Sequence, residues 1–405
     1  MSRHAPFWMY DVARARRPSF PRLRGDQAAR VVVVGGGLTG AACALTFAAA
    51  GIDVVLLEAD AVGSGMTAGD AGLLREGFAG SFHQAVSKHG LRTSRAAWDV
   101  MRRGALDFGA ALRRYGIKCG LDRADHIVFT AGSLEGARLR RDYQTRHEAG
   151  IEGSWLTPAA VMRETAIDSS GGIRTAGATL DPYRACLGLV AAAARRGARV
   201  HERSGVRRIR AAMRAITVVT DGGSIRAEAV IVATGAPIQD LRALRRHLRA
   251  EHAYGVVTAV LPAAMRRQVG RRSAALEDAS EPGRIIRWLP DHRVLVHGAW
   301  QPEVGSQSRD RAVTQRTGQL MYELSLAYPA ISGLPPAHSW DGTDYETPDG
   351  LPLLGPHRNF PGHLFTYGSS RHGAALAWVA ARLALRHFQG DATKADDALG
   401  FQRIL

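Results

Sequence analysis

One segment, Arg30 to Asp60, constrains the fold of this chain more than any other: RVVVVGGGLTGAACALTFAAAGIDVVLLEAD. It opens with a β-branched run that predicts a fully buried parallel strand. A glycine cluster follows, and the alanine-rich run from Leu38 to Ala50 predicts a helix. Val54 to Leu57 predict a second strand, which ends in Glu58. The segment therefore predicts a strand–helix–strand unit of an α/β protein.

The glycine cluster contains Gly35, Gly37 and Gly40 in GxGxxG spacing. The first glycine permits a tight turn, the second lets the backbone approach a pyrophosphate, and the third lets helix and strand pack closely. The helix N-terminus offers free N–H groups and the positive end of its dipole to phosphates. Glu58 lies 18 residues after Gly40 and can accept hydrogen bonds from ribose hydroxyls. We therefore expect a dinucleotide site.

This motif alone does not distinguish FAD from NAD. A second signal lies in Gly222 to Gly235, GGSIRAEAVIVATG, where a strand over Ala229–Ala233 ends in Thr234-Gly235. Val206 begins a strand of the same unit. A strand ending in Ala-Thr-Gly is common in flavoproteins with two dinucleotide-binding units, which favours FAD. Only one GxGxxG occurs, so a separate NAD(P)H domain is not evident.

On these motifs the chain resembles the flavoenzyme family of D-amino-acid oxidase, glycine oxidase and sarcosine oxidase. Within that family it is most similar to bacterial members related to gamma-glutamylputrescine oxidoreductase. The resemblance begins at Trp8 and Tyr10 and covers almost the whole chain. It is carried by GMTAGDAG at 65–72, LDPY at 180–183, the Ala-Thr-Gly turn, TPDGLPLLG at 347–355 and YGSSRHG at 367–373.

The resemblance implies an α/β fold in which a two-dinucleotide-binding, Rossmann-like FAD domain is interleaved with an α+β substrate domain on a mixed sheet. Residues 1–29 would form an N-terminal arm. The FAD domain would take residues 30–85, 155–240 and 335–405, and the substrate domain residues 86–154 and 241–334. Helices are expected at Thr93–Tyr115 and Ala374–Phe388, and a strand at Leu364–Thr366.

FAD is expected to bind without a covalent bond. No histidine lies near Gly69 and no cysteine follows Cys186, which are the regions where relatives attach the flavin. The motifs and the resemblance together assign these cofactor-binding residues: Gly35, Gly37, Leu38, Thr39, Gly40, Glu58, Ala59, Gly65, Met66, Thr67, Asp70, Ala71, Gly72, Leu73, Val206, Ala233, Thr234, Gly235, Gly355, Gly368, Ser370, Arg371, His372 and Gly373.

A carboxylated substrate needs a semi-buried cation, preferably arginine because its geometry is bidentate. Arg287 is the first candidate, because relatives place such an arginine on the strand before a hairpin; the alternative is a surface strand arginine. Arg371 and Arg75 come next. His372 could stabilise reduced flavin or orient the substrate, or could simply cap a helix.

The flavin-side segment departs from the family pattern. Gly69-Asp70 replaces the usual Arg-Asn, and Arg75-Glu76 follow where apolar residues are more usual. Asp70 and Glu76 could bind a substrate ammonium group. Tyr254 and Trp340 could wall the pocket, although aromatic residues are more often part of a core.

The net charge is +16, and only Lys88, Lys118 and Lys394 are lysines, so arginine supplies nearly all of the positive charge. A polyanionic partner is one explanation and arginine-rich codon usage is the favoured one. Residues 239–252 predict an amphipathic helix with Arg242, Arg245, Arg246 and Arg249 opposite Leu241, Leu244 and Leu248. Aromatic residues interleave poorly with these arginines, so nucleic acid is an unlikely partner.

The remaining composition excludes other classes. No apolar run reaches the roughly 18 residues that a membrane span needs. Cys43, Cys119 and Cys186 are scattered and form no CxxC, so we expect no metal site and a reducing, cytoplasmic location. Some relatives use a lysine above the flavin to help oxygen react, and none lies between Lys118 and Lys394. The electron acceptor therefore stays open between O2 and another acceptor.

These observations predict an FAD-dependent amine or amino-acid oxidase or dehydrogenase. It would oxidise a C–N bond by hydride transfer to flavin N5, giving an imine. Two alternatives remain: a flavoenzyme acting on an amine within tRNA or a carrier-bound intermediate, and a non-catalytic FAD-binding subunit.

Overall fold

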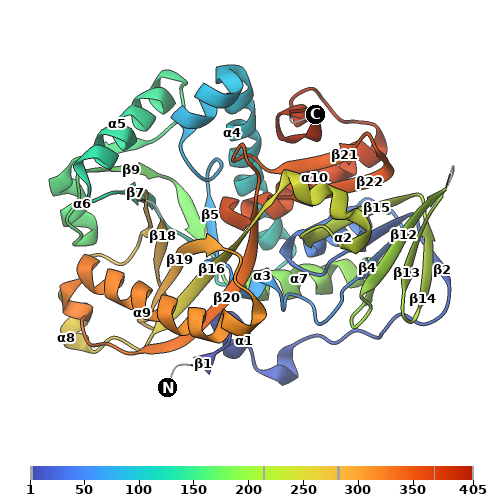
Figure 1. Ribbon diagram of the computed structural model, residues 1–405, viewed down its shortest axis with the longest axis horizontal. Coiled ribbons are helices and arrows are strands. Elements are labelled where there is room, and N and C mark those ends of the chain that lie inside the picture. The colour runs from blue at the N-terminus through green and yellow to red at the C-terminus, as the bar shows by residue number, and fades with distance from the viewer. Residues whose placement is uncertain (1–2, 213–214, 281–282, 369, 404–405) are drawn as a thin grey trace.

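A computed structural model describes residues 3–212, 215–280, 283–368 and 370–403. Two large β-sheets dominate it, one on each side of the molecule in Figure 1. The fold is α/β and interleaved, because segments from both halves of the chain enter both sheets.

The first sheet is built around the predicted strand–helix–strand unit. Its six strands, in order, are β11 (Arg199–His201), β4 (Val54–Leu57), β3 (Val31–Val34), β15 (Ala229–Gly235), β22 (Phe360–Tyr367) and β21 (Leu353–His357). All neighbours are parallel except β21 and β22. All four valines of β3 are buried, which is why this strand is a continuous β-branched run.

Three helices cover one face of this sheet: α2 (Leu38–Ala49), α7 (Pro182–Ala194) and α10 (Ala375–Gln389). A smaller sheet covers the other face, with strands β12 (Val206–Ala212), β13 (Ala215–Thr220), β14 (Gly223–Ala227) and β2 (Gln27–Ala28). Val31 and Val33 pack on the helical side, and Val32 and Val34 pack on the other side. The sheet is therefore buried on both faces.

The second sheet is mixed and has nine strands. In order they are β1 (Arg3–His4), β20 (Pro336–Glu346), β16 (Arg249–Thr258), β19 (Val294–Pro302), β18 (Arg284–Trp288), β17 (Ala275–Asp278), β7 (His126–Phe129), β9 (Gly172–Thr175) and β8 (Ser154–Leu156). Helices α6 (Pro158–Thr165), α8 (Ala263–Arg266) and α9 (Arg309–Ala327) contribute to the core on its outer face. Side chains alternate along β18, so Ile286 joins that outer core while Ile285 packs in the core that the two sheets share.

Two long helices, α4 (Phe82–Arg114) and α5 (Ser133–Glu148), pack together at one end of the molecule. Helix α4 is interrupted at Gly90, whose φ of 78° no helix allows, and it also packs against α10. A small sheet of β5 (Leu73–Arg75), β10 (Gly177–Thr179) and β6 (Asp122–Arg123) lies between the large sheets.

The N-terminal arm is part of the packed structure. Strand β1 joins the nine-stranded sheet and β2 joins the small four-stranded sheet. Between them α1 (Phe7–Asp11) buries Phe7 and Trp8. The remaining short elements are α3 (Met66–Gly69), η1 (Arg14–Arg16), η2 (Gln239–His247), η3 (Ser306–Ser308), η4 (Pro329–Ile331), η5 (Ser370–His372), η6 (Asp396–Leu399) and η7 (Phe401–Arg403).

Several expectations differ from the structure. Residues 154–175 and 336–346 supply β8, β9 and β20 to the nine-stranded sheet, so the predicted FAD segments begin too early at 155 and at 335. The helix predicted at Thr93–Tyr115 corresponds to the part of α4 that follows the break at Gly90 and ends at Arg114; the part before the break, from Phe82, was not predicted. These boundaries depend on which sheet a segment joins, and no local pattern specifies that choice.

The predicted basic helix at 239–252 was also wrong. Its first part is the 3-10 segment η2, and Arg249 begins the strand β16. Leu241 and Leu244 are buried as expected, while Arg242 and Arg245 are exposed. Pairing of β16 with both β19 and β20 supplies backbone hydrogen bonds that end the helical pattern.

Gly40 tests the packing of α2 on β3. A Cβ at this position would lie 1.8 Å from the carbonyl oxygen of Gly35. Gly40→Ala is therefore expected to lower the free energy of unfolding by about 1–3 kcal/mol and to weaken FAD uptake, as urea titration and flavin binding would show. Gly318→Ala is the control: it lies in α9 with no atom within 4 Å of a new Cβ, and should be neutral or slightly stabilising. Equal loss in both variants would contradict this packing.

Candidate FAD and substrate site

The glycine motif forms a closely packed turn between β3 and α2. Gly35 has φ +103°, and a Cβ there would lie 2.5 Å from the carbonyl oxygen of Ala233. Gly37 precedes α2 as its N-cap residue and offers no side chain to cap it, although the Thr67 hydroxyl accepts the Leu38 N–H at 2.8 Å. The turn thus leaves room and donors for a phosphate at the helix N-terminus.

Glu58 follows β4 beside this turn. Its carboxylate accepts the N–H of Gly36 at 2.6 Å and the N–H of Asp60 at 2.8 Å. Burial raises the pKa of Glu58, and the two N–H donors oppose that rise. A carboxylate fixed in this way next to the glycine turn is suited to bind a ribose.

The other predicted cofactor residues fall into two groups. Several lie at the ends of parallel strands, where open α/β sheets bind ligands: Glu58 and Ala59 after β4, Ala233, Thr234 and Gly235 in the last residues of β15, and Gly368 after β22. Gly65, Met66 and Thr67 lead through α3 to Asp70, Ala71, Gly72 and Leu73. Val206 begins β12 close to Ala59, since Gly205 would place a Cβ 3.5 Å from it. Ser369 and the side chain of Ser370 lie outside the described residues.

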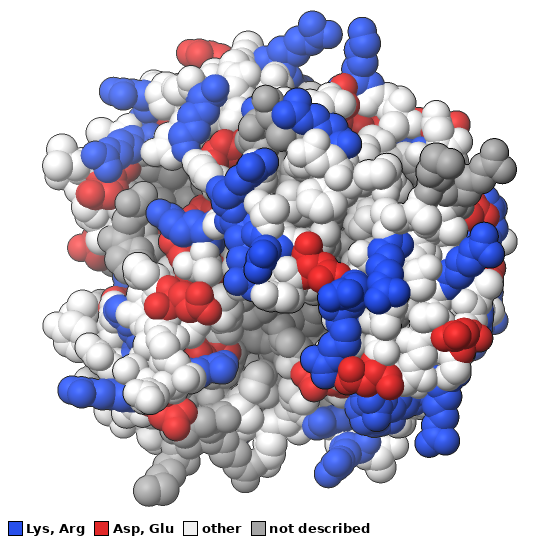
Figure 2. Space-filling model, turned by 45° about the vertical axis from the view of Figure 1, so that its right-hand side comes forward, with Lys and Arg blue, Asp and Glu red and all other residues white. Residues whose placement is uncertain are grey.

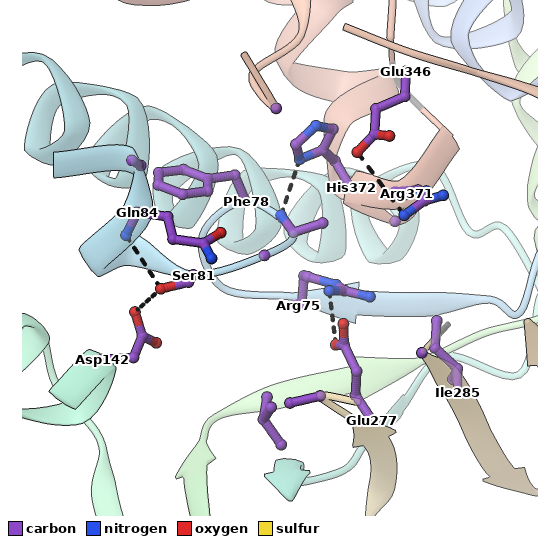
Figure 3. A pocket seen from close by; sticks show the side chains of 18 of the residues that line it. Arg75, Phe78, Ser81, Gln84, Asp142, Glu277, Ile285, Glu346, Arg371 and His372 are labelled. Atoms are coloured by element: carbon purple, nitrogen blue, oxygen red, sulfur yellow. Dashed lines mark hydrogen bonds and ion pairs between the residues drawn. The ribbon is translucent and has the colours of Figure 1, made fainter. Parts of the chain in front are cut away.

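A cavity of about 1070 Å³ lies where the two large sheets meet β5 and the start of α4 (Figure 3). Its volume exceeds that of ordinary ligand pockets, so it has room for a flavin ring and a substrate. Of the predicted residues it is lined by Asp70, Ala71, Leu73, Arg75, Glu76, Gly368, Arg371, His372 and Gly373.

A buried ion pair crosses the cavity floor. Arg75 of β5 lies 2.8 Å from Glu277 of β17, and the same carboxylate oxygen is 2.9 Å from Nε2 of His126 on β7. Burial opposes ionisation of Glu277, but the positive Arg75 and the hydrogen bond from His126 hold its pKa far below the usual range. Burial lowers the pKa of His126, so its ring donates as a neutral group. Arg75 is therefore fixed by an acid.

His372 lies on η5 above Arg75 in Figure 3. Its Nδ1 accepts the backbone N–H of Ala79 at 3.0 Å, so the ring proton is on Nε2. Burial, with Arg75 and other nearby arginines, lowers the pKa of His372 to about 3. The imidazole is therefore a neutral donor throughout the physiological range.

Arg371 is held among acids and an indole. It pairs closely with Glu251, lies 3.9 Å from Glu346, and its guanidinium stacks 4.5 Å from the ring centroid of Trp300. The neighbouring His297 is buried, and burial and Arg371 lower its pKa to about 4. A substrate carboxylate at Arg371 would compete with these acids.

Asp70 supplies a second kind of group to the cavity. Its Oδ1 accepts the N–H of Gly72 at 2.6 Å. Burial raises the pKa of Asp70 to about 6, and the Gly72 N–H and Arg75 limit that rise. Its carboxylate therefore titrates near neutral pH, unlike Glu277.

Some predicted residues lie elsewhere. Arg287 does not line the cavity, and its Nη1 donates to backbone carbonyls, so this nitrogen is not free to bind a carboxylate as was expected. Tyr254 packs in the outer core and Trp340 in the core that the two sheets share, so neither walls the cavity. Gly355 packs against His387 near the end of α10.

The cavity also contains residues that the sequence analysis missed. His126, Glu277, His297 and Trp300 come together only because β7, β17, β18 and β19 are neighbours in one sheet, and no local motif marks them. Lys88 of α4 also lines the cavity and is exposed, so a lysine is present although none lies between 118 and 394.

The described residues form no metal-ligating cluster, and none of the described helices has both the length and the apolar composition of a membrane span.

The fold and the site define a two-sheet α/β protein with a dinucleotide turn next to a charged cavity. A family model for FAD dependent oxidoreductases (DAO) matches residues 30–386, and the chain belongs to this family. Gamma-glutamylputrescine oxidoreductase of Escherichia coli strain K12 is 26% identical over 392 residues, or 96% of this chain and 90% of that protein.

Solved structures agree in fold. Glycine oxidase from Geobacillus kaustophilus matches with a TM-score of 0.77 and 22% identity, covering 92% of this chain and 98% of that one. L-Amino acid deaminase from Proteus myxofaciens in complex with anthranilate matches with a TM-score of 0.76 and 14% identity, over the full length of both chains. The chain is thus an FAD-dependent oxidoreductase.

The residues present fit FAD. The Gly35–Gly40 turn, the start of α2 and Glu58 suit its diphosphate and ribose. Nε of Arg75 and Nε of Arg371 are buried donors for which the described residues provide no acceptor, and both arginines line the cavity. Such donors are expected to hydrogen-bond to a bound group.

Glu277→Gln is expected to destabilise the protein by about 3–5 kcal/mol at pH 7, because it leaves Arg75 buried without its acid. The pKa of Glu277 is lower in the folded protein than in the unfolded chain, where it is near 4.5. Ionised Glu277 therefore stabilises the folded protein above pH 4.5, and this contribution to the free energy of unfolding declines as pH falls below 4.5. Urea unfolding at several pH values should show the difference from wild type shrinking below pH 4.5.

Glu228→Gln is the matched control for that variant. Glu228 pairs with Arg30 at 2.8 Å on the exposed surface, where a salt bridge contributes little. A loss in this variant as large as that of Glu277→Gln would contradict the importance of burial.

Asp70→Asn removes the titrating carboxyl while keeping an oxygen for the Gly72 N–H. The pKa of Asp70 is higher in the folded protein, about 6, than in the unfolded chain, near 3.8. Ionisation of Asp70 therefore lowers the free energy of unfolding as pH rises above 3.8, and this loss reaches its full size above about pH 6. The variant should therefore be more stable than wild type at pH 8 and nearly equal at pH 4. Equal stability at both pH values would show that Asp70 does not titrate in this way.

Proposed function

We propose that the protein oxidises a C–N bond of an amine or amino acid by hydride transfer to flavin N5, giving an imine. One observation carries the proposal: α3, whose Thr67 accepts the N–H of Leu38 at the dinucleotide turn, leads into a cavity that holds both Asp70 and a neutral His372. Its relative from Escherichia coli, named for an amine substrate, supports the same class of substrate.

Bound FAD would supply the acceptor for a hydride, which carries both electrons of the oxidation. A residue of the chain itself would remove the proton from the substrate nitrogen. A protonated amine has no free lone pair, so Asp70, ionised above about pH 6, takes a proton from the substrate ammonium. The C–H bond beside nitrogen then breaks as hydride leaves, and the nitrogen lone pair forms the C=N bond of a protonated imine. Water then adds to that carbon, and the products are a carbonyl compound and the released amine or ammonium, which keeps the protons on nitrogen.

His372 and Arg75 set the electrostatics of the cavity. Neutral His372 offers an Nε2–H donor, and Arg75, although paired with Glu277, has an Nε–H for which the described residues provide no acceptor. Fixed donors and cations stabilise negative charge that develops during reduction more than they stabilise the starting state. Both residues are therefore placed to favour acceptance of the hydride.

The charge distribution favours a substrate whose anionic group, if it has one, lies away from the oxidised bond. The inner arginines Arg75, Arg284 and Arg371 each have acid partners. Arg138 and Arg141 of α5 also line the cavity, are exposed, and have no ion-pair partner among the described residues. A distal carboxylate could bind there.

The two alternatives have weaker support. The exposed arginines Arg242, Arg245 and Arg246 of η2 do not line the cavity. The face of the molecule drawn in Figure 2 has basic side chains with acidic ones among them and no uniform basic patch. Binding of a tRNA would be expected to use such a patch. A non-catalytic subunit would not need a titratable group such as Asp70 in its cavity.

An anaerobic screen tests the proposal. Purified protein should be yellow and release FAD on denaturation, and at least one amine or amino acid should bleach the flavin. Protein that binds FAD but is reduced by no amine would favour a non-catalytic subunit, and salt-sensitive tRNA binding would favour the tRNA alternative.

Readmission of air to the reduced enzyme then identifies the electron acceptor. Rapid reoxidation indicates an oxidase, and slow reoxidation indicates a dehydrogenase with another acceptor. Lys88→Met should leave this rate unchanged if its exposed position keeps it away from the flavin.

A further inference from the structure

Four consecutive carbonyl groups beside the cavity are all held by buried side chains. The segment Gly69–Gly72 joins α3 to β5, and Asp70 and Ala71 line the cavity. Trp340 Nε1 donates to the Gly69 oxygen at 3.0 Å, and Trp8 Nε1 donates to the Asp70 oxygen at 2.8 Å. The donors come from β20 and from α1, which are far apart in the chain.

Arg287 holds the other two carbonyls. Its Nη1 lies 2.9 Å from the Ala71 oxygen, 3.3 Å from the Gly72 oxygen and 2.6 Å from the Leu180 oxygen. The side chain is 5% exposed, and no described carboxylate is hydrogen-bonded to it. Burial lowers the pKa of Arg287 to about 10, while Asp181 and Asp70 oppose that shift. A buried cation balanced by carbonyl dipoles is costly to fold, which suggests a role beyond packing.

The three donors form one packed unit. The Arg287 guanidinium lies over the Trp8 ring, 5.1 Å from its centroid. Gly72 has φ +69°, and a Cβ there would lie 2.4 Å from Arg287 Nη1 and 2.1 Å from the Leu180 oxygen. Only glycine therefore fits between Arg287 and this segment.

We propose that Trp8, Arg287 and Trp340 form a carbonyl clamp that fixes the backbone of 69–72 and thereby positions the Asp70 carboxylate in the cavity. The step from backbone to carboxylate is direct, because the Gly72 N–H donates to Asp70 Oδ1. Arg287 and Trp8 are thus positioning residues, and the N-terminal arm is part of the site. The role of Asp70 as a base rests on the proposed function, but the clamp does not.

Arg287→Met tests the clamp, because methionine keeps an unbranched apolar chain but loses the charge and the donors. Hydrogen exchange of peptides covering 66–75 in the apoprotein should accelerate at least tenfold, the order of magnitude for loss of one charge-assisted hydrogen bond. FAD should bind about tenfold more weakly. Arg287→Lys retains a charge with N–H donors and should restore much of both losses.

Trp8→Phe covers the case in which Arg287→Met does not fold, since it removes a single N–H and keeps a ring. It should accelerate exchange of the same peptides by a smaller factor. The matched controls are Trp155→Phe, whose indole stacks with Arg140 away from the cavity, and Arg199→Met, whose arginine donates to the Ala28 carbonyl. Both controls should leave 66–75 and FAD affinity unchanged.

The proposal is overturned if exchange at 66–75 is unchanged in Arg287→Met and in Trp8→Phe, or if it rises only in proportion to a general loss of protection across the nine-stranded sheet. Because exchange is measured without FAD or amine, its outcome is independent of the substrate screen. A clamp confirmed by exchange together with no reduction by any amine would remove the proposed function and leave the clamp in place.

Discussion

The ion pair between Arg75 and Glu277 joins the two halves of the molecule. Arg75 lies on β5, the short strand that follows α3, and Glu277 lies on β17 of the nine-stranded sheet. Both are largely buried, so neither charge is stable there without the other. The position of the cavity floor, and the distance between flavin-side and substrate-side elements, depend on this contact.

Two carboxylates close to that contact, Glu277 and Asp70, differ in their pKa values. Glu277 stays ionised because Arg75 and His126 surround it, whereas burial raises the pKa of Asp70 and its backbone N–H partner and Arg75 offset only part of that rise. The first fixes geometry and the second can exchange a proton near neutral pH. Such a difference between neighbouring carboxylates is the usual way in which a protein divides structural from proton-transfer roles.

The features predicted correctly from the sequence are those that depend on interactions between residues close together in the chain. The turn at Gly35 and Gly40, the end of β15 and the start of α10 all depend on short-range packing, and each lies where it was expected. Glu277 and His126 could not be found in this way, because they meet through pairing of β17 with β7. Arg287 shows the same limit: its strand was predicted, but Trp8 and the carbonyls of 69–72 reach it from distant segments.

The central claim is that a C–H bond next to nitrogen breaks as the flavin is reduced. Anaerobic single-turnover reduction by an amine, compared with the same amine deuterated at the carbon beside nitrogen, tests it most directly. The account predicts slower flavin bleaching with the deuterated amine and one imine-derived carbonyl product per flavin reduced. Equal rates under conditions where bleaching follows bond cleavage, or a product that retains both hydrogens on that carbon, would contradict it.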